Sequence, residues 1–249
     1  MKQSFLERVS REMAEDFPER DLPPREALAS ACRILAREGH ESGLAGQVTA
    51  RADRTGTWWT LPFGCGLDEA AGERMVLVDE DLKPLQGARP NPGVRFHVWV
   101  YRQRPDVNAI VHTHAPYASA LAATGAPLRV IHMDSAMLYG CAHLADWPGV
   151  PVADDEGRLI SGALGEAKTI LLANHGLLTV GVSVEEATYL AVFFERAARM
   201  QLRAMAAGGF REVKPELAAE ACRFLLQPSI VRATFAYWAR RACVTSSTC

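Results

Sequence analysis

The segment NAIVHTHA, residues 108–115, carries two histidines on a stretch whose pattern predicts a strand. Apolar, mostly β-branched residues alternate there with polar ones, which is typical of a buried strand. Side chains two positions apart on a strand point to the same face of the sheet, so we expect His112 and His114 to lie side by side. Two imidazoles on one face can occupy neighbouring positions around a single metal ion.

A second segment, KTILLANHGLLTVG at residues 168–181, predicts a strand, a turn and another strand. We expect Gly176 to allow the tight backbone that turns His175 toward a cleft. A third ligand for an ion at His112 and His114 must come from a separate element, and His175 is placed to supply it. Three neutral imidazoles leave a fourth position open for water or substrate, which is typical of catalytic metal sites.

Helical and strand patterns alternate along the rest of the chain. Ser183 followed by Glu186 forms a capping box that opens the longest predicted helix. This alternation predicts one layered α/β domain over residues 1–249, with a flexible tail after about residue 243. The expected helices cover residues 24–38, 96–104, 117–125, 185–207 and 216–226, and the other expected strands cover residues 46–51, 57–62 and 75–81.

The overall charge argues against a polyanionic partner. The 249 residues carry a net charge of −2, and neither half of the chain is strongly basic. We therefore expect no nucleic-acid partner and no membrane partner, and we expect a small-molecule substrate instead. The N-terminal stretch is charged and polar, and six cysteines show no regular spacing, so we predict a cytoplasmic protein with reduced thiols.

Three segments together resemble the class II aldolase/adducin family. They are GARPNPGVRFHVWVYRQRPDV at 87–107, IVHTHAPYASAL at 110–121 and LLANHGLLTVG at 171–181. The segments follow one another in the family's order, within a resemblance that covers roughly residues 25–210. The resemblance implies a three-layer α/β/α sandwich with a mainly antiparallel central sheet. It also implies a homotetramer with active sites between subunits.

The resemblance identifies the metal ligands residue by residue. His112, His114 and His175 match the family's three ligand histidines. We therefore expect one divalent ion per subunit. Zn²⁺ and Mn²⁺ suit three imidazoles, and Fe²⁺ or Co²⁺ would also suit them.

Three departures from the sugar-phosphate aldolases of the family fall on phosphate binding and proton transfer. After Pro90 those enzymes carry two phosphate-binding serines and an acid/base glutamate, and this chain has Gly93 at the position of the glutamate. Their Gly-Asn-x-Ser stretch corresponds here to residues 46–49, Gly-Gln-Val-Thr. Their tyrosine after a histidine corresponds to Met133. All three metal ligands remain, which indicates a retained metal site with a different substrate.

The remaining chemistry favours decarboxylation. A retro-aldol cleavage needs a base to remove a hydroxyl proton, whereas a departing carboxylate supplies its own electron pair. The segments TARADRTGTWWTLPFG at 49–64 and HMDSAMLYG at 132–140 also resemble the decarboxylases of the superfamily more than its aldolases. The substrate class that we favour is an ortho-hydroxy aromatic acid or an enolisable ring-fission acid.

Five further residues are candidates for the chemistry. His132 or Tyr139 is expected to protonate the carbanion. Thr49 and Arg51 lie in the region that matches the family's anion site, and a guanidinium can hold a carboxylate through two hydrogen bonds. Asp134 is expected to contact substrate or to orient a neighbouring histidine.

Three alternatives stay open on the sequence. The first is an aldolase that acts on a non-phosphorylated hydroxy-keto acid, and the second is an iron-dependent oxygenase built on the same histidines. The third is a structural or interaction domain of the adducin type. Retention of all three histidines argues against the third, because a purely structural domain has no need of ligands on two separate elements.

Overall fold

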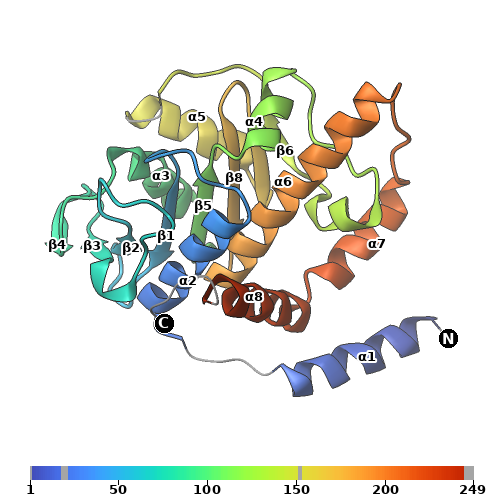
Figure 1. Cartoon of the computed structure of the whole chain (residues 1–249), viewed down its shortest axis with the longest axis horizontal. Coiled ribbons are helices and arrows are strands. Elements are labelled where there is room, and N and C mark those ends of the chain that lie inside the picture. Colours follow the sequence, from blue (N-terminus) through green and yellow to red (C-terminus); the bar gives the residue numbers. More distant parts are fainter. Residues whose placement is uncertain (1, 18–21, 151–152, 244–249) are drawn as a thin grey trace.

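The computed structural model describes residues 2–17, 22–150 and 153–243, and within them one eight-stranded sheet runs through the chain (Figure 1). Its strand order is β4-β3-β2-β1-β5-β8-β7-β6. Neighbouring strands are antiparallel throughout, except for the parallel pair β6 and β7. The strands are β1 (Gln47–Arg51), β2 (Trp58–Thr60), β3 (Val76–Val78), β4 (Pro84–Gln86), β5 (Ala109–Thr113), β6 (Ala142–Leu144), β7 (Thr169–Leu172) and β8 (Gly176–Gly181).

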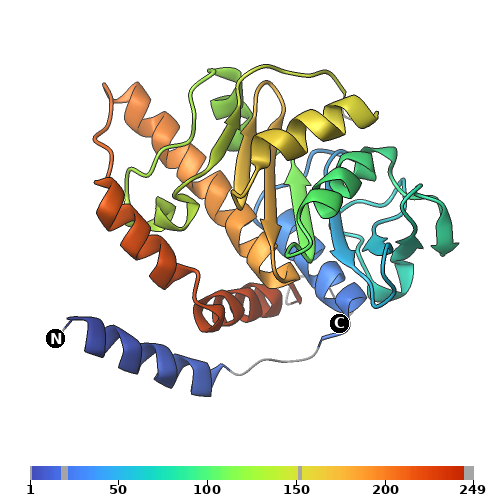
Figure 2. The same ribbon diagram turned by 180° about the vertical axis from the view of Figure 1, so that it is seen from behind.

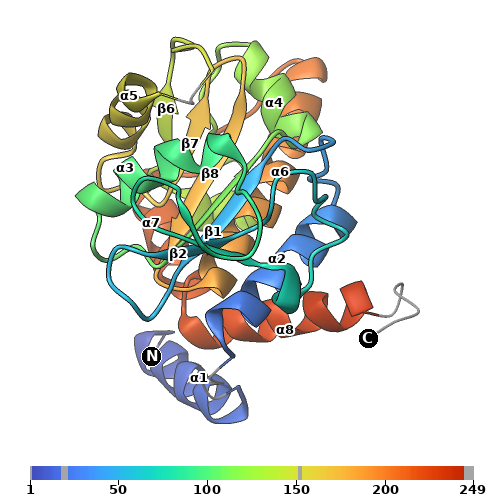
Figure 3. The ribbon, with the colours of Figure 1, turned by 90° about the vertical axis from the view of Figure 1, so that its left-hand side faces the viewer.

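Helices cover both faces of this sheet, so the predicted α/β/α sandwich is confirmed (Figure 3). The helices are α1 (Lys2–Asp16), α2 (Pro24–Arg37), α3 (Arg95–Gln103), α4 (Pro116–Ala123), α5 (Asp154–Leu164), α6 (Val184–Ala206), α7 (Pro215–Leu225) and α8 (Pro228–Cys243). Helices α2, α4, α6 and α8 lie on one face. Helices α3 and α5 lie on the other, where Figure 2 shows them in front of the strands.

Each face of the sheet has its own apolar core. The alternation along β5 sends Ile110 to the core under α3 and α5, and Val111 to the core under α2 and α6. Both side chains are fully buried. The central strands are therefore covered on both sides, which holds their ends in place for the residues that follow them.

The start of α6 shows how the predicted capping box differs in the structure. The Ser183 hydroxyl accepts a hydrogen bond from the Glu186 backbone N–H at 3.2 Å, as expected. The Glu186 carboxylate accepts from the Val182 N–H at 2.8 Å instead of from the cap residue itself, and it also pairs with Lys168. The reciprocal bond thus moves one residue upstream, and the helix start becomes tied to the beginning of β7.

No helix in the described ranges combines the length and the apolar character that a bilayer-spanning segment needs. The tail expected after about residue 243 lies outside the described residues. Described cysteines at positions 32, 65, 141 and 222 are free thiols.

Candidate metal centre

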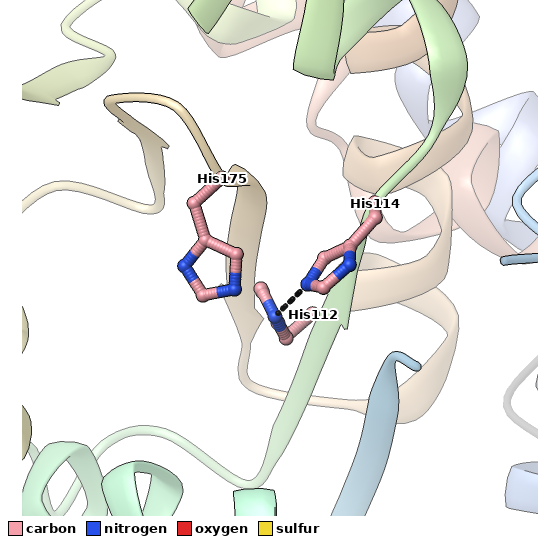
Figure 4. Close-up of side chains that lie close together, drawn as sticks. All are labelled: His112, His114 and His175. Carbon is pink, nitrogen blue, oxygen red and sulfur yellow. Dashed lines mark hydrogen bonds between the residues drawn. The ribbon is translucent and has the colours of Figure 1, made fainter. Parts of the chain in front are cut away.

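Three histidines from two separate parts of the chain meet at one end of the central strands (Figure 4). His112 lies on β5, and His114 follows directly after this strand ends at Thr113. His175 belongs to the turn between β7 and β8. One ligand nitrogen from each imidazole lies within 4.8 Å of the others. The structure therefore brings together the three residues that the sequence proposed as metal ligands.

Close contact between β5 and β8 makes this meeting possible. A Cβ atom on Gly176 would lie 2.4 Å from the carbonyl oxygen of Thr113, so only glycine fits at the first position of β8. The left-handed backbone of the turn falls on Asn174, whose φ is 52°, rather than on Gly176. Gly176 has a structural role, as expected, but it acts by letting β5 pack closely against β8 beside His175.

The orientation of His112 is set by a backbone carbonyl. Its Nδ1 lies 2.8 Å from the carbonyl oxygen of Leu177, which can only accept, so Nδ1 carries the proton. The Nε2 lone pair then faces the cluster, 3.1 Å from Nε2 of His114. The Phe96 ring meets the His112 ring edge-on at a centroid distance of 5.0 Å.

Burial favours the neutral form of all three imidazoles. It lowers the pKa of His112 well below the usual value, and the neighbouring histidines lower it further. The pKa of His114 is also lowered by burial. Burial and the adjacent His114 lower the pKa of His175 to about 4. Neutral imidazoles present lone pairs rather than positive charge, which is the state in which histidine binds a metal ion.

This donor set fits a divalent metal ion. Tetrahedral coordination with bonds of about 2.1 Å places neighbouring nitrogens roughly 3.4 Å apart, close to the 3.1 Å between His112 and His114. The carbonyl bond at Nδ1 of His112 is the kind of outer support that ligating histidines usually have. Among the described residues no carboxylate or thiol joins the three-histidine cluster.

Helix α4 connects the two parts of the cluster. The Glu195 carboxylate of α6 accepts hydrogen bonds from the backbone N–H groups of Tyr117 and Ala118, both at 2.8 Å, and so satisfies the first turn of α4. The Ser119 hydroxyl donates to the carbonyl oxygen of His175 at 3.0 Å. Residues 56 to 78 positions apart form these contacts, so no local pattern in the sequence predicts them.

The proposed substrate ligand Thr49 lies in the interior. Thr49 is fully buried, and its hydroxyl lies 2.9 Å from Nδ1 of His97 and 2.9 Å from the Tyr101 hydroxyl. Its hydroxyl is thus engaged with two buried side chains. A direct contact between Thr49 and a substrate finds no support in this arrangement.

The guanidinium of Arg51 is also engaged within the protein. It donates to the backbone carbonyl oxygens of Val107, Tyr101 and Arg104 at 2.6, 2.9 and 3.3 Å. The same group lies over the Tyr101 ring. Arg51 therefore ties β1 to the end of α3, and this geometry does not support the predicted carboxylate contact.

His132, Asp134 and Tyr139 lie in the segment 131–139, which packs against α6 and α7. In the described part of the chain, no hydrogen bond or ring contact joins any of them to the three histidines. Tyr139 is 44% exposed. Within one subunit these candidates therefore make no direct contact with the three histidines, and their roles stay predictions.

Comparison with known proteins agrees with this architecture. Residues 26–202 match the family described as Class II Aldolase and Adducin N-terminal domain. Decarboxylase NovR of Streptomyces niveus is 33% identical over 196 residues, which cover 76% of this chain and 73% of that protein. The 3,4-dihydroxyphthalate decarboxylase of Arthrobacter keyseri is 32% identical over 209 residues, covering 77% of this chain and 83% of that protein.

A solved structure extends the likeness from sequence to fold. The L-fuculose 1-phosphate aldolase from Glaciozyma antarctica PI12 superposes with a TM-score of 0.80 at 30% identity, covering 88% of each chain. The sequence match, the shared sheet and the three converging histidines agree: this chain belongs to the class II aldolase and adducin family.

Proposed function

We propose that this protein is a metal-dependent carbon–carbon lyase that decarboxylates an ortho-hydroxy aromatic acid or an enolisable ring-fission acid. The observation that carries this proposal is the composition of the cluster, in which three imidazoles converge and no described carboxylate joins them. Two relatives at 32–33% identity are named as decarboxylases, and one of them acts on a dihydroxyphthalate.

The reaction balance explains why this composition favours decarboxylation over aldol cleavage. In decarboxylation the bond to the carboxyl carbon breaks, its electron pair stays on the neighbouring carbon, and CO2 leaves. A proton then takes the place of the carboxyl group. A retro-aldol cleavage begins instead with removal of a hydroxyl proton by a base, and the cluster holds no carboxylate base for that step.

His112, His114 and His175 would hold the ion, with Zn²⁺ or Mn²⁺ as the proposed metal and Fe²⁺ or Co²⁺ as further candidates. When bound, a divalent ion supplies a Lewis acid that stabilises negative charge on an oxygen beside the reacting carbon. The protein itself holds the three neutral imidazoles in a fixed arrangement. The Leu177 carbonyl accepts a hydrogen bond from His112 Nδ1, and the Ser119 hydroxyl donates to the backbone carbonyl of His175.

A non-phosphorylated substrate is supported by the region that matches the family's phosphate-binding stretches. The Asn91 side chain accepts from the Gly93 N–H at 2.9 Å and donates to the Leu44 carbonyl at 3.1 Å, so both ends of its amide are engaged. The cavity beside it measures about 10 Å³, and its described lining contains no Lys, Arg or His. That volume holds about one water molecule and excludes a phosphate group.

Proton donation and assembly belong to this proposal as predictions. His132 and Tyr139 remain the candidate acids, and because neither reaches the cluster within one subunit, either would act on the site of a neighbouring copy. This arrangement agrees with the homotetramer that the family resemblance implies.

Metal analysis combined with product analysis tests the proposal. We expect about one divalent ion per chain in the purified protein, and metal-dependent CO2 release from a panel of hydroxy-aromatic and dienoic ring-fission acids. His114→Ala should lose both the metal and the activity while keeping the fold, because it removes one of three ligands. His143→Ala, on the separate strand β6, serves as the matched control and should keep both.

Other products point to other members of the family. An aldehyde product without CO2 would replace the decarboxylase by an aldolase, and oxygen uptake tied to Fe²⁺ would replace it by an oxygenase. A protein that takes up no metal under any loading condition would overturn the lyase proposal and favour an interaction domain. Full activity of His114→Ala with metal still bound would show that the ion lies elsewhere.

A further inference from the structure

His114 lies one residue beyond the last paired position of β5. The pairing of β5 with β1 ends at Gln47 and His112, and its pairing with β8 ends at Thr113 and Leu177. Two of the three proposed ligands therefore flank Thr113, and the backbone that carries His114 depends on how firmly Thr113 is held (Figure 4). Because a metal site needs its ligands held to within about 0.5 Å, any contact that fixes Thr113 bears on the metal centre.

The side chain of Thr113 lies on the other face of the sheet from the His112 imidazole, because successive residues of a strand alternate between the two faces. Thr113 is fully buried, and its hydroxyl oxygen lies 2.8 Å from Nδ1 of His40. Two glycines allow close packing around it. A Cβ on Gly46 would lie 3.7 Å from Cγ2 of Thr113, and one on Gly176 would lie 2.4 Å from its carbonyl oxygen. The hydrogen bond from His40 thus reaches a residue that is already closely packed.

The end of helix α2 fixes the position of His40. The Gly39 N–H donates to the Ala36 carbonyl at 3.1 Å, and the His40 N–H donates to the Leu35 carbonyl at 2.9 Å. These are the two bonds of a Schellman motif, and Gly39 has the positive φ, 85°, that this motif requires. The backbone of His40 is therefore tied to the last turn of α2, and its side chain, which is fully buried, extends from there to β5.

Packing alone does not account for a histidine at position 40. Its Nε2 atom is buried and has no hydrogen-bond partner in the part of the chain that the structure describes. A buried imidazole with one unpaired nitrogen costs free energy that an apolar side chain of similar size would avoid. The contact that an apolar side chain could not make is the hydrogen bond between Nδ1 and the Thr113 hydroxyl.

We infer that His40 is a positioning residue that fixes the end of β5 through the Thr113 hydroxyl and thereby sets the geometry of His112 and His114 at the metal centre. This inference rests on the metal centre of the proposed function, and it holds whichever reaction that centre catalyses. His40 acts from the opposite face of the sheet and through another residue. Its contribution is pre-organisation, because backbone that is already fixed loses less freedom when the ligands close on an ion.

Metal binding by Thr113 variants tests the inference without relying on turnover. Thr113→Val replaces the hydroxyl by a methyl group of similar size. We expect its Kd for Zn²⁺, measured by competition with a chelator, to rise about tenfold, at the lower end of the range for lost outer contacts of a metal site. The Co²⁺-loaded variant should absorb visible light more weakly, because a displaced His114 leaves room for additional water on the ion. Thr113→Ser keeps the hydroxyl and should restore both the Kd and the spectrum.

His40→Leu removes the same hydrogen bond from the other side and should match Thr113→Val in both measurements. In the double variant the two changes should add little to each other, because each removes the same contact. If either single variant fails to fold, the other one, together with Thr113→Ser, still decides the question.

Thr179→Val is the matched control for a loss that acts through stability alone. Thr179 is a fully buried threonine of the neighbouring strand β8, and its hydroxyl donates to the Ala187 carbonyl at 2.7 Å. This variant loses one buried hydrogen bond as Thr113→Val does, so urea unfolding should show a similar loss of stability. Its Kd for Zn²⁺ and its Co²⁺ spectrum should stay those of the wild type.

The possible failures are distinguishable. A wild-type Kd and spectrum in Thr113→Val would overturn the role of His40, and so would an equal rise of the Kd in Thr179→Val. A Thr113→Ser variant that binds Zn²⁺ no better than Thr113→Val would also overturn it, because the hydroxyl would then not be the group that matters. If the wild-type protein binds no metal, the metal centre and this inference fail together. If it binds metal but releases no CO2 from any acid, the decarboxylase proposal fails, and the role of His40 is still decided by the Kd values.

Discussion

At the scale of single residues, Gly176 shows how strictly the backbone around the histidines is defined. A methyl group at this position would lie 2.4 Å from the Thr113 carbonyl oxygen and 3.2 Å from the Cα of His114. Strand β5 would have to move away from β8 to make room. Gly176 therefore lies next to His175 in the chain and close to His114 in space.

Gly176→Ala should lower the free energy of unfolding by about 1–3 kcal/mol, in the range typical of overpacked sites, and should weaken metal binding by displacing His114. Urea unfolding and a metal titration measure the two effects. Gly162→Ala is the matched control, because a Cβ there has no atom within 4 Å on the surface of α5. Equal stability of the two variants would contradict the close contact between β5 and β8.

At the scale of secondary-structure elements, α4 depends on a residue of α6. The carboxylate of Glu195 accepts both free N–H groups at the start of α4, and Ser119 near the middle of α4 holds the His175 carbonyl. Because α4 begins two residues after His114, its position affects both segments that supply ligands.

Glu195→Gln should destabilise the fold by about 1–3 kcal/mol. Glutamine has only one acceptor oxygen, so one of the two N–H groups at the start of α4 would face an amide NH2 instead of an acceptor. We also expect a several-fold weaker affinity for the metal, measured by competition with a chelator. Glu216→Gln, an exposed position in the first turn of α7, is the control and should change neither quantity. Unchanged stability and affinity in Glu195→Gln would mean that α4 is held by packing alone.

At the scale of the whole molecule, buried neutral histidines make stability depend on pH. His40 is fully buried, and its Nδ1 lies 2.8 Å from the Thr113 hydroxyl. It therefore contacts β5 at the residue between His112 and His114. Burial, together with the charge of Arg196, lowers the pKa of His40 to about 3. Burial alone lowers the pKa of His97, beneath Thr49, to about 3 as well.

The sign of the effect follows from the two states. Between about pH 6.5 and pH 3 the unfolded chain binds a proton at each of these histidines and the folded chain does not. The free energy of unfolding should therefore fall as the pH falls through this window, by up to about 1.4 kcal/mol per pH unit for each histidine. Denaturant unfolding of the wild type and of His40→Asn measures it. The variant should show the shallower slope, and equal slopes would contradict a neutral buried His40.

The local pattern of the sequence was sufficient to predict the central elements and to select the three histidines that the structure brings together. Strong periodicity predicted α2, α6 and β5 to within one or two residues, because their apolar faces repeat at the spacing that the core requires. Family membership, expected from the motifs around the histidines, is confirmed by the match over residues 26–202. Weakly patterned elements, such as the exposed edge strand β4 and the half-buried β6, gave no comparable signal.

The histidines themselves, His112, His114 and His175, could be proposed from the sequence because residue type and a spacing of two on a strand are local properties. Only the tertiary structure decided what surrounds them. The register of β1 against β5 places Gln47 opposite His112, and the 3₁₀ turn before α3 brings Gly93 close to the side-chain amide of Gln47. The tertiary structure also gives the polar groups of Thr49 and Arg51 hydrogen-bond partners inside the protein, so the contacts that we expected them to make with substrate find no support. Such contacts join residues more than 40 positions apart, and chain spacing carries no information about them until the sheet has formed.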